Sequence, residues 1–144
     1  GTNRCGSKRA ERPVIVADAS TVIEILLRAS LSTPCEQRLL GGSELICVPH
    51  LIDLEIAQVL RRYVLRHDID EKRGAQAIDD LIDLPILRYP HEPLLPRIWD
   101  LRQNLSAYDA AYVALAEALQ VPLITCDAGI ASSPGHTVVV ELIS

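Results

Sequence analysis

Four acidic residues occur where a folded chain could bring their carboxylates together. Asp18 and Asp127 each follow an apolar run, in "VIVAD" and "LITCD", while Glu55 and Asp109 lie in segments with helical periodicity. Oxygen ligands without Cys or His select hard cations such as Mg²⁺ or Mn²⁺. A bound ion of this kind acidifies water and neutralises phosphate charge, so the four residues would suit phosphodiester hydrolysis. The set is compatible with one metal ion or with two.

The two strand-end aspartates also have a simpler explanation, because an Asp at this position can cap the helix that follows. Two such residues at neighbouring parallel strand ends favour a site, since ligands bind at the carboxyl edge of parallel sheets. A divalent cation would offset the repulsion between Asp18 and Asp127. Ser20 and Thr125 each lie two residues from one of these acids. They could orient a carboxylate or a water, or serve only in capping and turns.

Glu55 and Asp109 are each open to two interpretations. Glu55 lies on the apolar side of its predicted helix, where a carboxylate is costly to bury without a partner; it could instead reach water at the rim. Ser106-x-x-Asp109 matches a capping box, so helix initiation could account for both residues. The residues that follow Asp109 are small and apolar, which favours close packing around it. The apolar helical neighbours of Glu55 are Leu51, Ile52, Ile56 and Val59.

The charge distribution limits the kinds of partner. A net charge of −5 excludes a general nucleic-acid coat, but a metal-dependent nuclease remains compatible with it. Arg61, Arg62, Arg66 and His67 crowd together, whereas no Lys or Arg follows Arg102. The cluster could steer a phosphate backbone. It is equally well explained as a solvated helix end whose cations suit the macrodipole.

The apolar periodicity predicts strands that alternate with helices. Such alternation gives βαβ units, and hence an α/β fold with a mostly parallel sheet of about five strands flanked by helices. The predicted strands cover 13–17, 44–49, 85–90, 121–126 and 136–142. The predicted helices cover 20–29, 33–42 (with Thr33 as cap), 49–68, 70–84, 92–104 and 106–119.

The length of 144 residues fits one domain, which we assign to 13–144. Residues 1–12 are polar and lack an initiator Met, so we expect a disordered leader or a remnant of processing or engineering. No apolar run is long enough to span a membrane, and no signal peptide is visible. We therefore expect a cytoplasmic protein whose cysteines are isolated thiols, because they show neither disulfide nor zinc-site spacing. These cysteines are Cys5, Cys35, Cys47 and Cys126.

Four stretches, taken in order, resemble PIN-domain ribonucleases, and specifically the VapC toxins of bacterial type II toxin–antitoxin pairs. The match runs over nearly the whole chain, from Val14 to Ile143, and is most specific in "YDAAYVALAEAL" followed by "PLITCD". The stretches are "VIVADASTVIEILL", "VPHLIDLEIAQVLRR", "LSAYDAAYVALAEAL" and "PLITCDAGIA".

The resemblance implies a Mg²⁺- or Mn²⁺-dependent endoribonuclease in which Asp18, Glu55, Asp109 and Asp127 form the acidic quartet. It also implies a homodimer silenced by a cognate VapB-type antitoxin, which typically directs an Arg toward the acidic pocket. Two alternatives are a PIN-like module that binds without cutting and a structure-specific DNA nuclease. A phosphoryl-receiver domain is excluded, because it would need paired acids after the first strand and a late Lys, and no Lys follows Lys72.

Overall fold

A central parallel sheet organises the chain, and the computed structural model describes residues 12–144 of it. The five strands have the order β3-β2-β1-β4-β5, and every neighbouring pair is parallel. This confirms the predicted α/β fold with a mostly parallel sheet. The strands are β1 (Val14–Ala17), β2 (Leu45–Pro49), β3 (Ile86–Tyr89), β4 (Leu123–Thr125) and β5 (Val140–Leu142).

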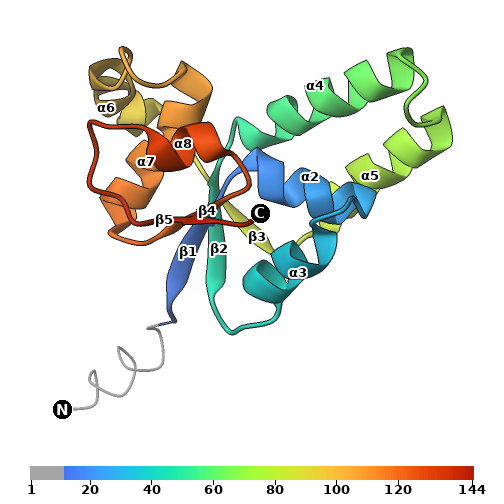
Figure 1. Ribbon diagram of the computed structural model, residues 1–144, viewed down its shortest axis with the longest axis horizontal. Helices are drawn as coiled ribbons and strands as arrows, with labels where there is room; N and C mark the ends of the chain where they lie inside the picture. Colours follow the sequence, from blue (N-terminus) through green and yellow to red (C-terminus); the bar gives the residue numbers. More distant parts are fainter. Residues whose placement is uncertain (1–11) are drawn as a thin grey trace.

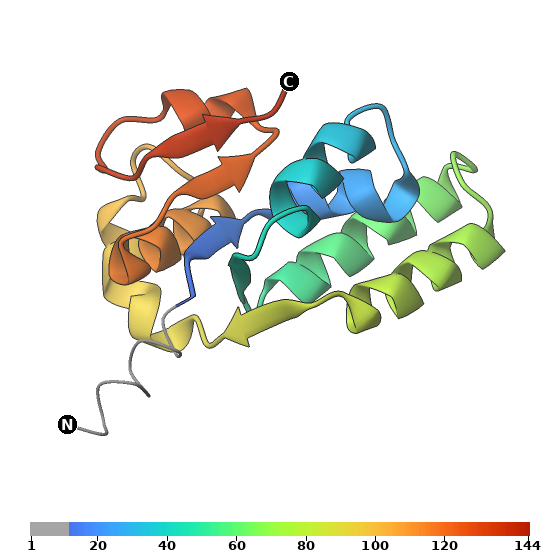
Figure 2. The same ribbon diagram turned by 90° about the horizontal axis from the view of Figure 1, so that it is seen from below.

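The helices form two groups on opposite sides of the strands (Figures 1 and 2). α2 contacts α3, α4 and α5 in one group, while α6 packs on α7 in the other. α4 and α5 form a pair that projects beyond the sheet (Figure 1). Within the described part of the chain, no helix has the length and apolarity needed to cross a bilayer. The helices are α2 (Ala19–Leu27), α3 (Ser32–Leu40), α4 (Ile52–Leu65), α5 (Glu71–Asp83), the 3-10 turn η1 (Glu92–Leu94), α6 (Leu95–Asp100), α7 (Ala107–Leu119) and α8 (Ala128–Ser132).

The strand order places β1 between β2 and β4. The chain moves outward from β1 through β2 to β3 and then returns to the other side of β1 to form β4, so β1 and β4 flank the point where the winding direction reverses. In doubly wound sheets the carboxyl ends of the strands at this point form the ligand-binding crevice. Asp18 directly follows β1, and Asp127 comes two residues after the end of β4. The topology therefore brings both strand-end acids to the same edge.

Small side chains let α7 approach the sheet closely. α7 contacts β1, β2 and β4, and every residue from Ala110 to Ala116 is buried. Four of these seven residues are alanines, which place little side-chain volume between the helix backbone and the strands. The face that begins with Asp109 is thus held near the carboxyl edge of the sheet.

Several predicted boundaries were wrong. The helix expected over 92–104 divides into η1 and α6, and α6 ends at Asp100, followed by a turn. Pro96, which lacks a backbone N–H, is tolerated because it lies in the first turn of α6. Thr33 does not cap α3, which begins at Ser32 without a side-chain cap. The strand expected over 136–142 is hydrogen-bonded as β5 only over its last three residues. The other predicted elements exist, with ends that differ by up to three residues.

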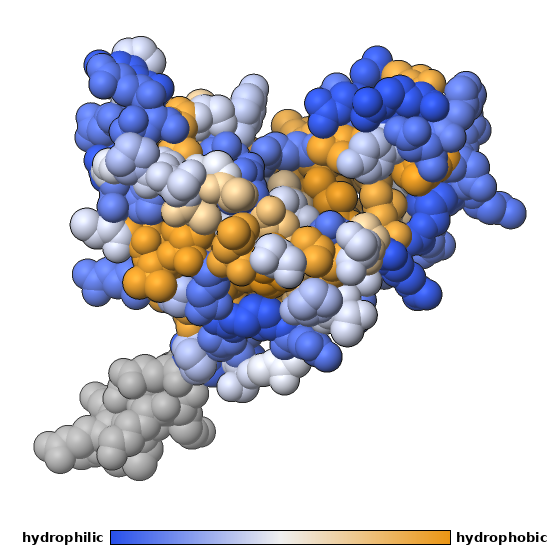
Figure 3. Space-filling model, viewed as in Figure 1, coloured by the Kyte–Doolittle hydropathy of each residue, from blue (hydrophilic) through white to orange (hydrophobic). Residues whose placement is uncertain are grey.

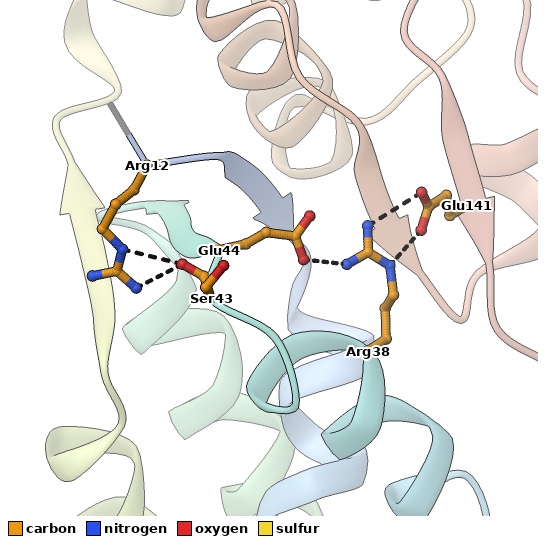
Figure 4. A network of polar contacts seen from close by, with 5 residues as sticks. All are labelled: Arg12, Arg38, Ser43, Glu44 and Glu141. Carbon is orange, nitrogen blue, oxygen red and sulfur yellow. Dashed lines mark hydrogen bonds and ion pairs between the residues drawn. The ribbon is translucent and has the colours of Figure 1, made fainter. Parts of the chain in front are cut away.

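A guanidinium ties α3 to the short edge strand β5 (Figure 4). Arg38 donates to both carboxylate oxygens of Glu141, at 2.7 and 3.2 Å, and to Glu44 at 2.6 Å. These carboxylates raise the pKa of Arg38 further, so the pairing persists at any ordinary pH. Arg12 donates twice to the carbonyl oxygen of Ser43 in the same view. The prediction of a disordered leader concerns residues that, apart from Arg12, lie outside the described part of the chain.

We predict that Arg38→Ala lowers the free energy of unfolding by about 1 kcal/mol, because a bidentate pair and a second carboxylate lose their partner together. Urea denaturation followed by circular dichroism measures the change. Arg66→Ala is the matched control, since the ion pair of Arg66 with Asp68 is 3.7 Å long and both side chains are exposed. Equal stability of the Arg38 and Arg66 variants would contradict a structural role for this network.

Candidate active site

Asp18 is the most deeply buried carboxylate of the four, at 3% exposure. It is the N-cap of α2, and its Oδ1 accepts hydrogen bonds from the backbone N–H of Thr21 (3.3 Å) and from Ser20 Oγ (2.6 Å). Its Oδ2 accepts from Thr125 Oγ1 at 2.5 Å. The capping interpretation and the site interpretation therefore describe the same residue, because the cap fixes the carboxylate at the sheet edge. Burial raises the pKa of Asp18, and these hydrogen bonds only partly oppose that shift.

Thr125 connects the ends of β1 and β4. Its hydroxyl donates to Asp18 and accepts from the backbone N–H of Asp127 at 2.9 Å. Ser20 Oγ lies 3.4 Å from the Thr125 hydroxyl and accepts from the backbone N–H of Cys126 at 2.9 Å. Both hydroxyl residues singled out from the sequence thus contact Asp18, and they link its carboxylate to the loop that carries Asp127.

Asp127 is the N-cap of α8. Its Oδ1 accepts from the backbone N–H groups of Gly129 (2.7 Å) and Ile130 (3.4 Å). A Cβ at position 129 would come within 3.0 Å of this oxygen, so the absence of a side chain there suits the turn. The cap uses Oδ1, and Oδ2 of Asp127 accepts no hydrogen bond from residues 12–144.

Glu55 projects from the first turn of α4 and is held by a tyrosine on α7. The hydroxyl of Tyr112 donates to Glu55 Oε1 at 2.5 Å, and the Tyr112 side chain is buried. Burial raises the pKa of Glu55, the bond from Tyr112 lowers it, and the charges of Asp109 and Asp18 raise it again. Sequence analysis missed Tyr112, although its position three residues after Asp109 places both on the same face of one helix.

Asp109 lies in the first turn of α7, and its backbone N–H donates to Ser106 Oγ at 3.1 Å, as the capping pattern predicted. Burial raises the pKa of Asp109, and the charge of Asp127 raises it further. The same Asp109 carboxylate contributes to the raised pKa values of Asp18 and Glu55. The four predicted acids are therefore close enough for their charges to act on one another.

No cation offsets this repulsion within residues 12–144. The ion pairs there involve other acids, and none includes any of the four carboxylates. Carboxylates that repel each other in a half-buried place without an Arg or Lys favour a bound cation, because its charge would relieve the repulsion. The site thus combines uncompensated negative charge with hard oxygen donors.

The donor set fits a hard divalent ion. In the present conformation, however, no three His, Cys, Asp or Glu side chains of residues 12–144 lie close enough together to enclose one. Mg²⁺ is commonly held by one or two carboxylates and several waters, so a fully protein-built cage is not required. Oδ2 of Asp127, Oε2 of Glu55 and the carboxylate of Asp109 are the oxygens that would hold the ion. Both oxygens of Asp18 already accept hydrogen bonds; Oδ1 accepts two, whereas Oδ2 accepts one from Thr125 and retains a lone pair for the ion or an ordered water.

A groove of about 450 Å³ adjoins Glu55. It lies between α4 and the start of α7, and the space-filling view shows the molecule hollowed between the α4–α5 lobe and the lobe that contains α6, α7 and α8 (Figure 3). Leu54 and Tyr108 are exposed along it, at 77% and 62%. The groove therefore offers an aromatic face, an apolar floor, an amide and a cation beside the acidic site. Its lining is Leu51, Leu54, Glu55, Gln58, Val59, Arg62 and Tyr108.

The structure separates the arginines that sequence analysis grouped together. Arg62 lines the groove, two helical turns beyond Glu55. Arg66 lies near Asp68 and over the ring of Tyr63, and Arg61 is exposed away from the groove lining. Only Arg62 of the three is thus positioned to meet a ligand that also reaches Glu55.

Comparison with known proteins agrees with this fold. The family model described as "PIN domain" matches residues 15–134. Ribonuclease VapC12 of Mycobacterium tuberculosis is 37% identical over 91% of this chain and all of its own length. Ribonuclease VapC1 of the same organism is 42% identical over 89% of this chain and 96% of its own length. A VapC ribonuclease of Mycobacterium bovis, Mb0985, is 45% identical over 79% of this chain and 86% of its own length.

Solved structures share the architecture at low sequence identity. PAE2754 from Pyrobaculum aerophilum superposes with a TM-score of 0.67 and 16% identity, over 89% of this chain and 83% of that chain. Mycobacterium tuberculosis VapC20, described as a sarcin-ricin loop cleaving toxin, gives a TM-score of 0.64 and 11% identity over 82% and 93%. At such identity the likeness concerns the fold, while the sequence relatives define the group. This chain belongs to the PIN-domain family and, within it, to the VapC proteins.

Proposed function

We propose that this protein is a Mg²⁺-dependent endoribonuclease, with Mn²⁺ as a substitute, and that it is the toxin of a toxin–antitoxin pair. The observation that carries the proposal is the gathering of Asp18, Glu55, Asp109 and Asp127 at one sheet edge, where none of them has an ion-pair partner among residues 12–144. The names of the sequence relatives, which are ribonucleases, support RNA as the substrate. A DNA nuclease has no specific observation in its favour.

Each residue has a distinct role in this proposal. A bound divalent ion would lower the pKa of a water molecule and neutralise charge on the scissile phosphate. The four acids hold the ion together, and Asp18 does so from the most buried position. Thr125 and Ser20 keep the Asp18 carboxylate in one orientation, and Tyr112 does the same for Glu55. Positioning of this kind matters because small displacements at a reacting centre reduce rates strongly.

The groove beside Glu55 suits single-stranded RNA. An exposed aromatic ring such as Tyr108 can stack on an unpaired base, and Gln58 can hydrogen-bond a base edge. Arg62 supplies one cation at the far end, where a neighbouring phosphate would pass. The net charge of −5 leaves most of the phosphate neutralisation to the metal ion.

The proposed partner is a VapB-type antitoxin that inserts an Arg into the acidic site. The four carboxylates have no ion-pair partner among residues 12–144, and a guanidinium with its planar donors matches such a pocket. Assemblies named VapBC2 and VapBC-1 occur among the structural neighbours, which agrees with a partner of this kind. A homodimer in the cytoplasm stays a prediction, to be checked by light scattering on the purified chain.

Asp109→Asn and Asp18→Asn are each expected to reduce Mg²⁺-dependent RNA cleavage by at least about 100-fold, because each removes a charge from the proposed ion site. A fluorescent single-stranded RNA digest with and without Mg²⁺ measures the rate, and circular dichroism checks the fold. Asp79→Asn is the matched control, since Asp79 is an exposed acid on α5. Cleavage by both variants at the wild-type rate would reject the proposal, and an inert wild type would favour a binding module.

Asp109→Asn is also expected to raise the melting temperature of the metal-free protein near pH 7. The pKa of Asp109 in the folded chain lies above its ordinary value of 3.8, so the folded state binds its proton more tightly. The free energy of unfolding contributed by Asp109 is therefore highest below that ordinary value and is lost as pH rises through the raised pKa. The difference between variant and wild type should widen as pH rises from the ordinary value of 3.8 through the raised pKa, and stay constant above it.

Mg²⁺ should reverse this ranking, because it stabilises the wild type more than the variant. Differential scanning fluorimetry over a series of pH values, with and without Mg²⁺, measures both effects. A variant that is less stable than wild type at every pH would show that the Asp109 side chain stabilises the folded state and that repulsion from the neighbouring carboxylates does not destabilise it.

Arg62→Gln should weaken RNA binding more than Arg61→Gln, because only Arg62 lines the groove beside Glu55. Removal of one phosphate contact with single-stranded RNA flattens the slope of log K against log salt by about 0.7. Fluorescence anisotropy in Ca²⁺, or with Asp109→Asn to prevent cleavage, gives the slope. Equal slopes for both variants and wild type would indicate that these arginines form only a solvated helix surface and do not contact RNA.

A further inference from the structure

Two cysteines that sequence analysis treated as isolated thiols lie in contact. Cys35 Sγ and Cys126 Sγ are 3.5 Å apart, although the residues are separated by 91 positions in the chain. Cys35 comes from α3 and is fully buried, whereas Cys126 directly follows β4 and is partly exposed. Cys47, the other cysteine of the described residues, lies in β2 and contacts Tyr89 instead.

The contact has two chemical interpretations. Buried cysteines often pack as small apolar residues, and the two sulfurs could do no more than that. A metal site of two thiolates lacks a third ligand, since no group of three metal-binding side chains exists in residues 12–144. A disulfide needs only a shift of about 1.5 Å, because the bond length is about 2.05 Å. The partly exposed Cys126 gives an oxidant access to the pair.

We propose that Cys35 and Cys126 form a reversible disulfide under peroxide stress and that this bond slows the proposed ribonuclease. In the first step the sulfur of Cys126 attacks hydrogen peroxide, the O–O bond breaks, and a sulfenic acid and water form. In the second step the sulfur of Cys35 attacks the sulfenic sulfur, the S–O bond breaks, and a disulfide and a second water form. Peroxide accepts the two electrons, and a dithiol returns them on reduction.

Burial sets the rate of this reaction. Cys35 is fully buried and Cys126 is only partly exposed, so peroxide and the attacking thiol meet slowly. Brief or weak exposure to peroxide should therefore leave the pair reduced. The bond is expected to accumulate only under sustained oxidation, which distinguishes this pair from a fast peroxide sensor.

The location of Cys126 connects the bond to the acidic site; this step rests on the proposed function. Cys126 lies between Thr125, which donates to Asp18, and Asp127. Its backbone N–H donates to Ser20, which in turn donates to Asp18. A pull of Cys126 toward α3 would move both neighbours, and a displacement of about 1 Å at a reacting centre costs about 100-fold in rate. The oxidised protein should therefore cleave RNA about 10- to 100-fold more slowly.

Peptide mapping tests the bond without reference to activity. The purified full chain is treated with hydrogen peroxide, remaining thiols are alkylated, and trypsin is added without reductant. Cleavage after Arg28, Arg38 and Arg102 should give peptide 29–38 linked to peptide 103–144. Cys35→Ser and Cys126→Ser should each lack this product, and Cys47→Ser should retain it. Absence of the linked peptides from wild type, while Cys126 is oxidised further to sulfinic acid, would overturn the proposal.

Cleavage assays on the same samples test the consequence. Wild type oxidised by sustained peroxide treatment should slow about 10- to 100-fold and recover with dithiothreitol, whereas Cys35→Ser should keep its rate after the same treatment. Linked peptides with an unchanged cleavage rate would overturn the regulatory part of the proposal. A reduced wild type without any Mg²⁺-dependent cleavage would refute the proposed function, and the peptide map would still decide whether the bond forms.

Discussion

Asp18 is 3% exposed, and a carboxylate buried this deeply must receive its hydrogen bonds from the fold around it. The first turn of α2 supplies one donor, Ser20 a second, and Thr125 a third from another strand. These donors hold the carboxylate in place, but they only partly oppose the effect of burial, so its pKa stays raised. The fixed position of this carboxyl group at the sheet edge is the property on which the whole acidic site depends.

The rest of the fold brings further acids toward that carboxyl group. The alanines of α7 allow the helix to lie close to β1, β2 and β4, which brings Asp109 to the same edge. Tyr112 on the same helix holds Glu55 from α4, so one helix positions two of the four acids. Accumulated repulsion of this kind destabilises the metal-free protein and favours a cation. The fold thus gives up some stability at the place where it would bind an ion.

Positive charge is arranged in a complementary way. Arg38, Arg88 and Arg97 each form a bidentate pair with an acid away from the site, and these pairs join elements of the scaffold. Arg62 lines the groove beside Glu55 and forms no ion pair within the described chain. The paired arginines therefore contribute to the stability of the scaffold, whereas the acids of the site are left unpaired for the proposed chemistry.

Local patterns in the sequence determined most of the secondary structure and the candidate site residues of this protein. Apolar runs and their punctuation identified all five strands, and capping residues located the starts of α5 and α7, because both depend on near neighbours. The short helix α8 was not predicted. The same patterns singled out the four acids, since each breaks or ends an apolar segment. Local rules failed in η1 and α6, where a predicted single helix divides and ends early.

Only the tertiary structure decided which distant residues meet. Thr125 reaches Asp18 across 107 residues because β4 returns to lie beside β1, and Tyr112 reaches Glu55 because α7 packs near the start of α4. The contact between Cys35 and Cys126 arises in the same way. Strand order and helix packing follow from the burial of the whole chain, which no local periodicity encodes.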